Sequence, residues 1–225
     1  MDKVVLVVAA HPDDEVLGCG GTIARHSEAG DIVHILFMSD GVLSRINRNI
    51  NEIDQRKNAA KKVSLILGAE SPRFLNYADN CMDATPFLDI VQSLEQIIKE
   101  VGPDVIYTHH LGDLNIDHQL THKAVMTACR PVPGSLIREI YSFEILSSTD
   151  WASSSSRNLF IPNYFVDIVA TKDKKIAALR EYQDEIRIFP HSRSIESIKS
   201  LMLLRGSSVG LASAECFMVN RIVIK

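Results

Sequence analysis

The sequence predicts a mostly parallel, doubly wound α/β sheet with helices on both faces and an addition at the C-terminal end. Two observations lead to this prediction. The segment VVLVVAA (4–10) is continuously apolar and rich in β-branched residues, as expected for a strand that is covered on both faces. Apolar strand patterns then alternate with helical patterns through the first half of the chain, which is typical of βαβ units.

The individual elements follow from periodicity and from helix start and stop signals. Gly30 and Gly68 follow helical patterns in the manner of C-terminal caps, and Thr85-Pro86 indicates an N-cap with proline at the first helical position. The last third is less regular and is predicted to add an antiparallel edge or a cap. In chain order we expect strands at 4–10, 31–39, 73–75, 104–110, 139–145, 164–169 and 217–224, and helices at 15–29, 53–67, 86–101, 118–129, 172–186 and 194–204.

The composition is that of an ordinary folded protein. The 225 residues are 46% apolar and 23% charged, so the chain can bury enough surface to offset its ordering entropy. The net charge of −4 argues against a broad nucleic-acid footprint, which would be basic. We see no linker that would separate a second domain, and we expect residues 1–225 to form one domain.

Nothing in the sequence predicts export or membrane insertion. The apolar run at 4–10 is short and ends in a charge cluster, without the cleavage site of a signal peptide or the length of a membrane span. The four cysteines are scattered without paired spacing, which is typical of reduced, mostly buried thiols. We therefore expect a cytoplasmic protein without stable membrane insertion, and the sequence leaves a homo-oligomer open.

The first predicted strand ends in the polar sequence HPDDE (11–15). Ligands of open parallel sheets bind at the carboxyl ends of strands. Four ionisable groups this close together are costly unless they are solvated, paired or bound to a metal. The alternative is a polar turn in which Asp13 or Asp14 caps the following helix.

A second polar segment, HHLGDLNIDH (109–118), follows another buried strand. Its Asp117-His118 pair is informative because a carboxylate beside a histidine often supports a metal site. His122 lies one helical turn beyond His118 and is favoured as a surface or supporting histidine. His109 or His110 alone would indicate little.

Topology connects the two segments. In the common doubly wound order the first strand lies beside the fourth, so the two segments would face each other across one crevice. A histidine and an aspartate from one segment and a histidine from the other make an N,N,O ligand set that leaves a position open for water, as a catalytic zinc site requires. A spare carboxylate beside the metal would accept a proton from that water.

With these motifs the chain resembles the PIG-L/LmbE family of metal-dependent N-deacetylases. The resemblance rests on AHPDDE (10–15) and the Asp-His pair, and it extends to Ser39-Asp40-Gly41, Arg56, HSRS (191–194), RG (205–206) and AECF (214–217). It implies a Rossmann-like fold and one zinc ion per chain, although such a site also accepts Fe²⁺ or another divalent ion. The implied activity is removal of the acetyl group from an N-acetylated sugar, nucleotide sugar or glycoconjugate by a zinc-activated water.

Carried over residue by residue, the resemblance implies that His11, Asp14 and His118 are the metal ligands. It makes Asp13 the general base that activates the water. Asp117 becomes the partner that tunes a neighbouring catalytic or ligand histidine.

The chain departs from the family pattern at Asn115. Many members have a histidine three residues before the last ligand, where it is assigned to stabilise the oxyanion or to protonate the leaving amine. An asparagine amide can donate to an oxyanion but cannot deliver a proton. Protonation of the leaving amine would then fall to Asp13 or to another group such as His191 or His110.

Substrate contacts are inferred from position in the sequence. Arg45 and Arg56 follow the loop after the second strand, and each is either a substrate contact or a surface charge. Trp151 is either an aromatic platform beside a sugar or a packing residue. The tail motifs, which either close the pocket or brace the fold, contribute His191, Arg193 and Glu215.

Two other functions compete with deacetylation. A dinucleotide-binding oxidoreductase would have GxGxxG directly after the first strand. Here GCGGT (18–22) lies within the predicted helix, and the carboxylates of HPDDE would repel a pyrophosphate. The second alternative is a catalytically weakened sugar-binding member of the same fold, which Asn115 leaves open and the intact ligand set argues against.

Overall fold

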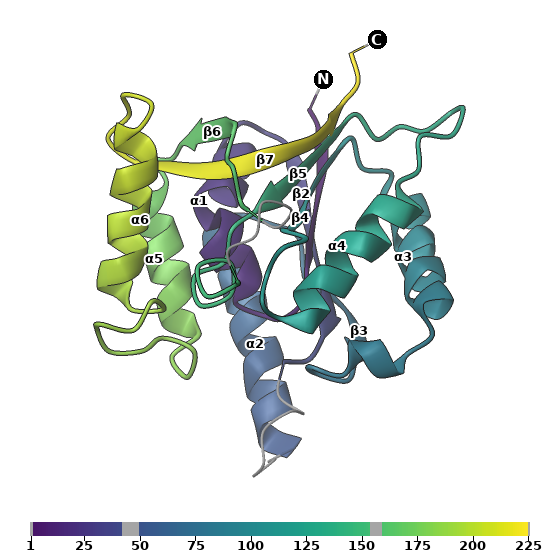
Figure 1. The fold of residues 1–225 in the computed structure, drawn as a ribbon, viewed down its shortest axis with the longest axis horizontal. Helices are drawn as coiled ribbons and strands as arrows, with labels where there is room; N and C mark the ends of the chain where they lie inside the picture. The colour runs from purple at the N-terminus through teal and green to yellow at the C-terminus, as the bar shows by residue number, and fades with distance from the viewer. Residues whose placement is uncertain (1, 42–49, 154–158, 225) are drawn as a thin grey trace.

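The strands form one mixed sheet at the centre of the molecule. A computed structural model describes residues 2–41, 50–153 and 159–224. Within these residues the sheet has seven strands in the order β3-β2-β1-β4-β5-β7-β6 (Figure 1). Strands β1 to β5 are parallel, and β7 runs antiparallel to both β5 and β6. The predicted doubly wound sheet with an antiparallel addition is confirmed.

The elements follow the predicted order, with a short 3₁₀ turn, η1, in addition. Their bounds are β1 Val4–Ala9, α1 Asp14–Glu28, β2 Ile32–Ser39, α2 Ile50–Leu67, β3 Arg73–Tyr77, η1 Met82–Ala84, α3 Phe87–Val101, β4 Val105–His109, α4 Ile116–Ala128, β5 Glu139–Phe143, β6 Tyr164–Asp167, α5 Lys172–Glu181, α6 Ile195–Ser207 and β7 Ala214–Ile222.

Several boundaries differ from the prediction for local or tertiary reasons. Helix α4 begins at Ile116, because the side chain of Asn115 accepts a backbone N–H of the first turn. Pro86 takes the N-cap position of α3 itself. Helix α5 ends at Glu181, because Tyr182 turns out of the helix and its hydroxyl donates to a carboxylate of the first turn of α1. Strand β7 begins earlier than predicted because its first residues pair with β6.

Strand β1 lies between two hydrophobic cores, and its side chains alternate between them. Val5, Val7 and Ala9 belong to the core that includes residues of α1, α2, α5 and α6. Leu6 and Val8 belong to the core beneath α3 and α4. All five are fully buried, and burying a side chain such as leucine or valine stabilises a fold by about 1.5–3 kcal/mol. The apolar run at the N-terminus is therefore the central strand that its composition predicts.

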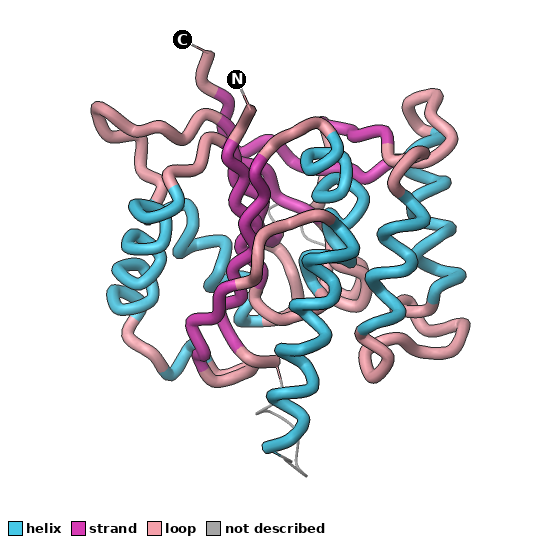
Figure 2. Tube along the Cα trace, turned by 180° about the vertical axis from the view of Figure 1, so that it is seen from behind, coloured by secondary structure: helices cyan, strands magenta, loops and turns pink. Residues whose placement is uncertain are grey.

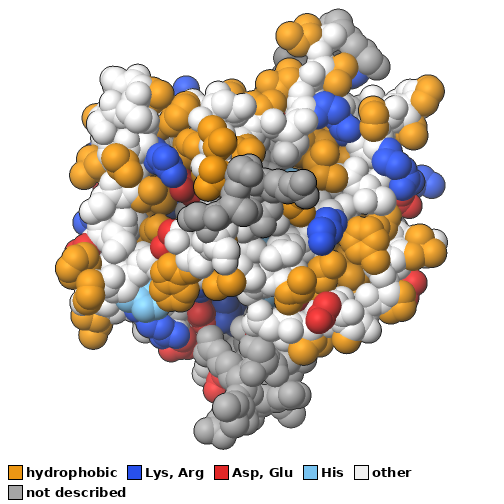
Figure 3. Space-filling view, in the orientation of Figure 1, with side chains coloured by type: hydrophobic (Ala, Val, Ile, Leu, Met, Phe, Trp, Pro, Cys, Tyr) orange, Lys and Arg blue, Asp and Glu red, His pale blue; other side chains and the backbone are white. Residues whose placement is uncertain are grey.

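The helices cover both faces of the sheet. The views from the front and from behind show α3 and α4 together on one side and α1, α2, α5 and α6 on the other (Figures 1 and 2). On the face shown in Figure 3, the described Lys and Arg side chains are scattered among apolar and acidic ones. None of the described helices combines the length and the apolar composition that a membrane span needs.

The four cysteines are free thiols in the structure. Cys19, Cys129 and Cys216 are buried, as the sequence predicted for most of them, whereas Cys81 is exposed. Cys81 directly precedes η1, which the sequence analysis did not anticipate.

Candidate metal centre

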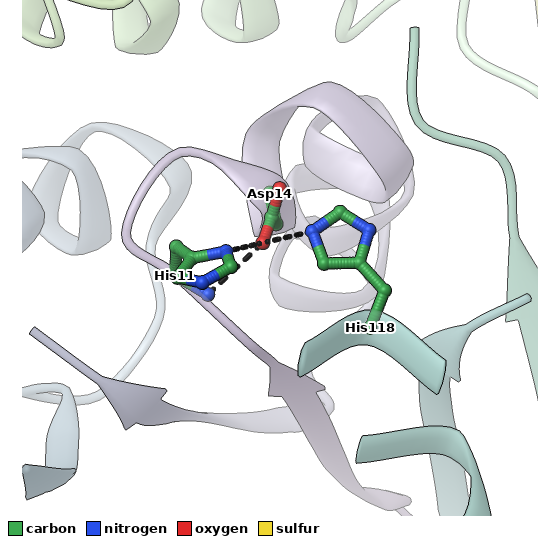
Figure 4. Close-up of side chains that lie close together, drawn as sticks. All are labelled: His11, Asp14 and His118. Atoms are coloured by element: carbon green, nitrogen blue, oxygen red, sulfur yellow. Dashed lines mark hydrogen bonds and ion pairs between the residues drawn. The ribbon is translucent and has the colours of Figure 1, made fainter. Parts of the chain in front are cut away.

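The candidate metal centre lies at the carboxyl ends of β1 and β4. The two strands pair in parallel, with Val8 opposite Thr108, so the turns that follow them start side by side. His11 and Asp14 come from the turn after β1 and the start of α1, and His118 comes from the first turn of α4 (Figure 4). The sequence prediction that the two polar segments meet is confirmed.

These three side chains form a compact N,N,O set. Asp14 Oδ2 lies 3.1 Å from His11 Nδ1 and 3.3 Å from His118 Nε2 (Figure 4). All three residues are buried, and their ligand atoms lie within 4.8 Å of one another. In a tetrahedral zinc site with bonds of about 2.0–2.1 Å, neighbouring ligand atoms lie about 3.3 Å apart. The two measured distances fit that spacing.

In each of the two histidines, a carboxylate contacts the ring nitrogen that does not face Asp14. His118 Nδ1 lies 2.9 Å from Asp113 Oδ2, and His11 Nε2 lies 3.1 Å from Asp117 Oδ2. When a carboxylate accepts the N–H of an imidazole, the other ring nitrogen is free to act as a ligand. In both rings that other nitrogen faces Asp14. Asp117 thus contacts His11, on the neighbouring turn, rather than His118, its neighbour in sequence.

Two atoms of the N,N,O set have no hydrogen-bond partner among the described residues. They are Asp14 Oδ1 and His118 Nε2, and both are buried. Buried polar atoms nearly always have a partner, so such exceptions indicate an absent ion or water. A cation at the N,N,O set would give His118 Nε2 a partner, and the donor set of two imidazole nitrogens and one carboxylate fits a single divalent metal ion.

The local electrostatics favour the ionised forms of Asp14 and Asp113. Burial by itself would raise the pKa of Asp14, but the interactions with the neighbouring rings of His118 and His109 hold this pKa well below its usual range. Burial also opposes ionisation of Asp113, yet the same two histidines lower its pKa to about 2. A metal ligand must be deprotonated, and Asp14 meets that requirement at neutral pH.

Asp13 stands beside the ligands and has an unusual backbone conformation. Its φ of 127° lies in a region that non-glycine residues rarely adopt. It occupies the N-cap position of α1, but its side chain makes no capping hydrogen bond. Instead Asp13 Oδ2 accepts a hydrogen bond of 2.8 Å from Arg193 Nη1. The structure thus does not support the alternative role of Asp13 as a helix cap, and strain of this kind collects at functional sites.

The environment of Asp13 also moves its pKa toward neutrality. Burial raises the pKa of Asp13 to about 6, although the positive charges of Arg193 and Arg56 oppose the shift. Arg56 Nη2 lies 3.5 Å from Asp13 Oδ1. A buried carboxylate with a pKa near the working pH is suited to accept and return a proton.

Arg56 is tied to the backbone of the turn that carries Asp13. Its Nη2 and Nε donate to Pro12 O at 2.7 and 3.1 Å, and its Nη1 donates to Gly41 O at 2.9 Å and to Glu185 Oε1 at 2.5 Å. These contacts place the predicted substrate-binding arginine at the site rather than on the surface. They also show that it fixes the turn after β1.

Asn115 is both a helix cap and a residue of the site. Its Oδ1 accepts the N–H of Asp117 at 2.8 Å, which caps α4, and its Nδ2 donates to Asn80 Oδ1 at 2.8 Å. Because Oδ1 is used in the capping bond, the amide N–H₂ is the end of the side chain that is directed toward Asn80 and the adjoining cavity. Its second hydrogen remains available to a ligand in the adjoining cavity.

The remaining substrate-binding candidates have different outcomes. His191 lies in the loop before α6, where its ring packs edge-on against Trp151, with 5.4 Å between centroids. Its Nδ1 accepts the N–H of Arg193, so it supports the arginine that holds Asp13. Trp151 is half-exposed. Arg45 lies outside the described residues. Glu215 lies on β7 and braces α1, as described below.

The other histidines of the second polar segment have supporting positions. His109 is fully buried and stacks on His118, with 3.9 Å between ring centroids. Its Nε2 accepts the N–H of Ala10 at 2.8 Å. Burial and the neighbouring charge of His118 lower the pKa of His109 to about 4. His122 is buried and donates to the carbonyl of His109 at 2.9 Å, which is the supporting role that the sequence favoured.

Three acidic residues of the site, Asp113, Asp79 and Glu185, were not assigned from the sequence. Asp113 supports His118, as described above. Asp79 Oδ1 lies 3.2 Å from His11 Nε2, beside Asp117. Asp79 follows β3, so the rule that polar residues gather at the carboxyl ends of parallel strands would have found it. Asp113 had no distinctive signal, because one aspartate in a polar loop is common.

A polar cavity opens beside the N,N,O set. Its volume is about 130 Å³. The walls carry both signs of charge and several amide groups, a surface suited to a ligand rich in hydroxyl groups. The lining residues are His11, Asp13, Gly41, Arg56, Asp79, Asn80, Asn115, Glu185 and Arg193.

Fold and site together define an α/β protein with a candidate mononuclear metal centre at the switch point of its sheet. The family model described as "PIG-L: GlcNAc-PI de-N-acetylase" matches residues 6–129. This match covers more than half of the chain, and the chain therefore belongs to the PIG-L/LmbE deacetylase family.

The individual relatives are similar to this chain in sequence, but they are named for different functions. The "Uncharacterized deacetylase YaiS" of Escherichia coli K12 is 31% identical over 190 residues, which cover 80% of this chain and 91% of that protein. The 4-oxalmesaconate hydratase of Pseudomonas putida is 28% identical over 232 residues, covering 94% and 84%. The structure of N,N'-diacetylchitobiose deacetylase from Pyrococcus horikoshii superposes with a TM-score of 0.78 at 20% identity, covering 96% of this chain and 83% of that one. This last comparison shows the shared fold.

The N,N,O set predicts a metal content that depends on His118. We expect the purified protein to contain about one divalent ion per chain and His118→Ala to contain far less, because the variant loses one of three protein ligands. Elemental analysis of both proteins measures this. His34→Ala, which changes a histidine on β2 remote from the centre, is the matched control and should retain the ion. An unchanged metal content in His118→Ala would remove this residue from the ligand set.

Proposed function

We propose that residues 1–225 act as a single metal-dependent domain that hydrolyses the acetamido group of an N-acetylated sugar, nucleotide sugar or glycoconjugate to acetate and the free amine. The observation that supports it most is the buried set of His11, Asp14 and His118, together with the polar cavity beside it that His11 and Asp13 both line. Membership of a deacetylase family supports the reaction type.

The three ligands would hold one divalent ion, for which zinc is our first choice. Such an ion acts as a Lewis acid toward a carbonyl oxygen, and it lowers the pKa of a water molecule that it binds to near neutrality. Asp113 and Asp117 would fix the two histidine rings in the tautomers that ligation requires.

Asp13 is the proposed general base. It would accept a proton from the attacking water as the carbon–oxygen bond forms. The same proton would pass to the nitrogen as the carbon–nitrogen bond breaks, which leaves acetate and an amine. Arg193 would keep the carboxylate pointed at the cavity through its 2.8 Å hydrogen bond. His191 and His110, the other candidates for the second transfer, are not among the described residues that line the cavity.

Asn115 is the proposed donor to the oxyanion. Its Nδ2 is oriented by two contacts, the capping bond of Oδ1 to Asp117 N–H and the bond of Nδ2 to Asn80. A donor that is already oriented costs no reorganisation when negative charge develops. Arg56, Asp79 and Glu185 line the rest of the cavity and are suited to sugar hydroxyl groups.

The proposed activity is tested by acetate release. The metal-loaded protein is incubated with a panel of N-acetylated monosaccharides, nucleotide sugars and glycosides, and acetate and new amine are measured together. Equal amounts of both products support the proposal. Saturable binding of these sugars without acetate would instead indicate a sugar-binding member with a weakened site. Hydration of an unsaturated tricarboxylate such as 4-oxalmesaconate, without acetate release, would place the chain with its hydratase relative.

The role of Asp13 predicts a specific defect. Asp13→Asn should retain the metal and the fold but lose about 10²–10⁴-fold in kcat, because the amide cannot accept the proton. Asparagine is nearly isosteric and tolerates a positive φ as well as aspartate does, so the strained backbone is preserved. Metal analysis accompanies the kinetics. A variant that loses its metal would show that Asp13 is a ligand rather than the base.

The role of Asn115 predicts an effect that is separable from helix capping. Asn115→Ala should lower kcat by about 10²–10³-fold, the usual cost of one oxyanion donor, with little change in metal content. Asn115→Ser retains a capping oxygen but lacks the amide, so it should be as slow as the alanine variant. Asn115→His should introduce a pH dependence near neutrality. Wild-type turnover in Asn115→Ala, or full recovery in Asn115→Ser, would leave Asn115 as a cap alone.

A further inference from the structure

Helix α1 carries Asp14 in its first turn and is broken near its middle. Cys19 has φ −148° and ψ 25°, which are not helical values, so the helix consists of two segments joined at a kink. In a continuous α-helix the N–H of Gly21 would donate to the carbonyl of Leu17, four residues earlier. The first segment includes Asp14 and ends at this break.

A buried ion pair joins the two segments across the break. Gly21 N donates to Glu215 Oε1 at 2.9 Å, and Lys175 Nζ donates to Leu17 O at 2.9 Å. The same Glu215 Oε1 accepts from Lys175 Nζ at 2.6 Å. The ion pair thus links the donor and the acceptor of one helical turn. Glu215 Oε2 also accepts from Thr22 N and Thr22 Oγ1, at 2.7 and 2.6 Å.

Gly18, next to the break, lies tightly against the sheet. A Cβ atom on Gly18 would lie 2.4 Å from the ring of Phe143 on β5, which leaves no space for a side chain. Phe143 contacts the edge of the His109 ring at 4.8 Å between centroids, and His109 stacks on His118 at 3.9 Å. The first segment of α1 is therefore in contact, through two rings, with the histidine that completes the N,N,O set.

Stability alone is a weak reason for this ion pair. The side chains of Lys175 and Glu215 are each only 3% exposed, and replacing a buried ion pair by apolar side chains is often neutral or stabilising. Both residues lie in the C-terminal part of the chain, on α5 and β7, beyond the residues 6–129 that match the family model. Their contacts with the broken helix indicate a role in placing it.

We propose that the Lys175–Glu215 pair is a positioning device for the metal centre. It fixes the direction of the first segment of α1 and so sets where Asp14 stands relative to His11 and His118. This inference rests on the proposed metal site. Without the pair the first segment of α1 can shift against Phe143, and the N,N,O set loses its spacing.

The test compares Co²⁺ binding in three proteins. The variant Lys175→Met/Glu215→Gln removes both charges and the donor to Leu17 O, and it leaves no unpaired buried charge. Leu94→Ala is the matched control, because Leu94 is fully buried on α3 in the core on the other face of the sheet. Thermal unfolding is recorded for each protein. The Kd for Co²⁺ is measured by chelator competition, and the visible absorption of bound Co²⁺ reports the ligand geometry.

We expect the double variant to bind Co²⁺ about 10–100-fold more weakly, the range seen when residues that support ligands are changed, with an altered Co²⁺ spectrum. Leu94→Ala should lower the unfolding temperature and keep the wild-type Kd and spectrum. The milder variant Lys175→Gln/Glu215→Gln, which retains polar groups for Leu17 O and Gly21 N and leaves no unpaired buried charge, should stay closer to the wild type and serves as a second measurement if the first double variant does not fold.

The outcomes separate this inference from the proposed function. A wild type that binds Co²⁺ and a folded double variant with the same Kd and spectrum would overturn the positioning role alone. Equal changes in the double variant and in Leu94→Ala would also overturn it, since general destabilisation would then account for them. A wild type that binds no Co²⁺ would overturn the metal site and this inference with it.

Discussion

The site depends on the parallel pairing of β1 with β4. This pairing places the strand that precedes His11 beside the strand that leads to His118, so two turns far apart in the sequence share one point of the sheet. The buried side chains of β1 on both faces hold its register. A one-residue slip would exchange the faces of every side chain and separate the two turns. The chemistry of the site thus rests on the same packing that stabilises the sheet.

Buried charge is the second organising feature of the site. Asp13, Asp14, Asp79, Asp113 and Asp117 are all buried within a small region. Such groups are costly unless each is paired, hydrogen-bonded or bound to a cation. The histidines and arginines around them contact several of these carboxylates, and Asp14 Oδ2 lies between the two histidine nitrogens of the N,N,O set. A group of this kind could hold a metal ion.

The C-terminal third contributes to the site although it supplies none of the proposed metal ligands. Arg193 holds Asp13, Glu185 pairs with Arg56, and Lys175 with Glu215 spans the break in α1. All of these contacts converge on the segment that runs from the turn after β1 into α1. A strained backbone such as that of Asp13 persists only where its surroundings over-determine it. The C-terminal elements provide those surroundings. The sheet of βαβ units alone therefore does not account for the conformation of Asp13 and of the turn after β1.

The sequence by itself determined the sheet class, the central strand and the polar turns that follow β1 and β4. These features are local: periodicity, composition and the order of elements are all written along the chain. Strand order also predicted that a histidine and an aspartate of one turn meet a histidine of the other, and the resemblance to the PIG-L/LmbE family identified them as His11, Asp14 and His118. Tertiary structure alone decided which carboxylate contacts which histidine. Asp117 contacts His11 across the crevice. His118 is contacted by Asp113 instead. Tertiary structure also decided the contacts of Arg193, of Asp79 and of the Lys175–Glu215 pair. Each of these contacts is made between residues far apart in the sequence, and no periodic pattern along the chain indicates such a contact.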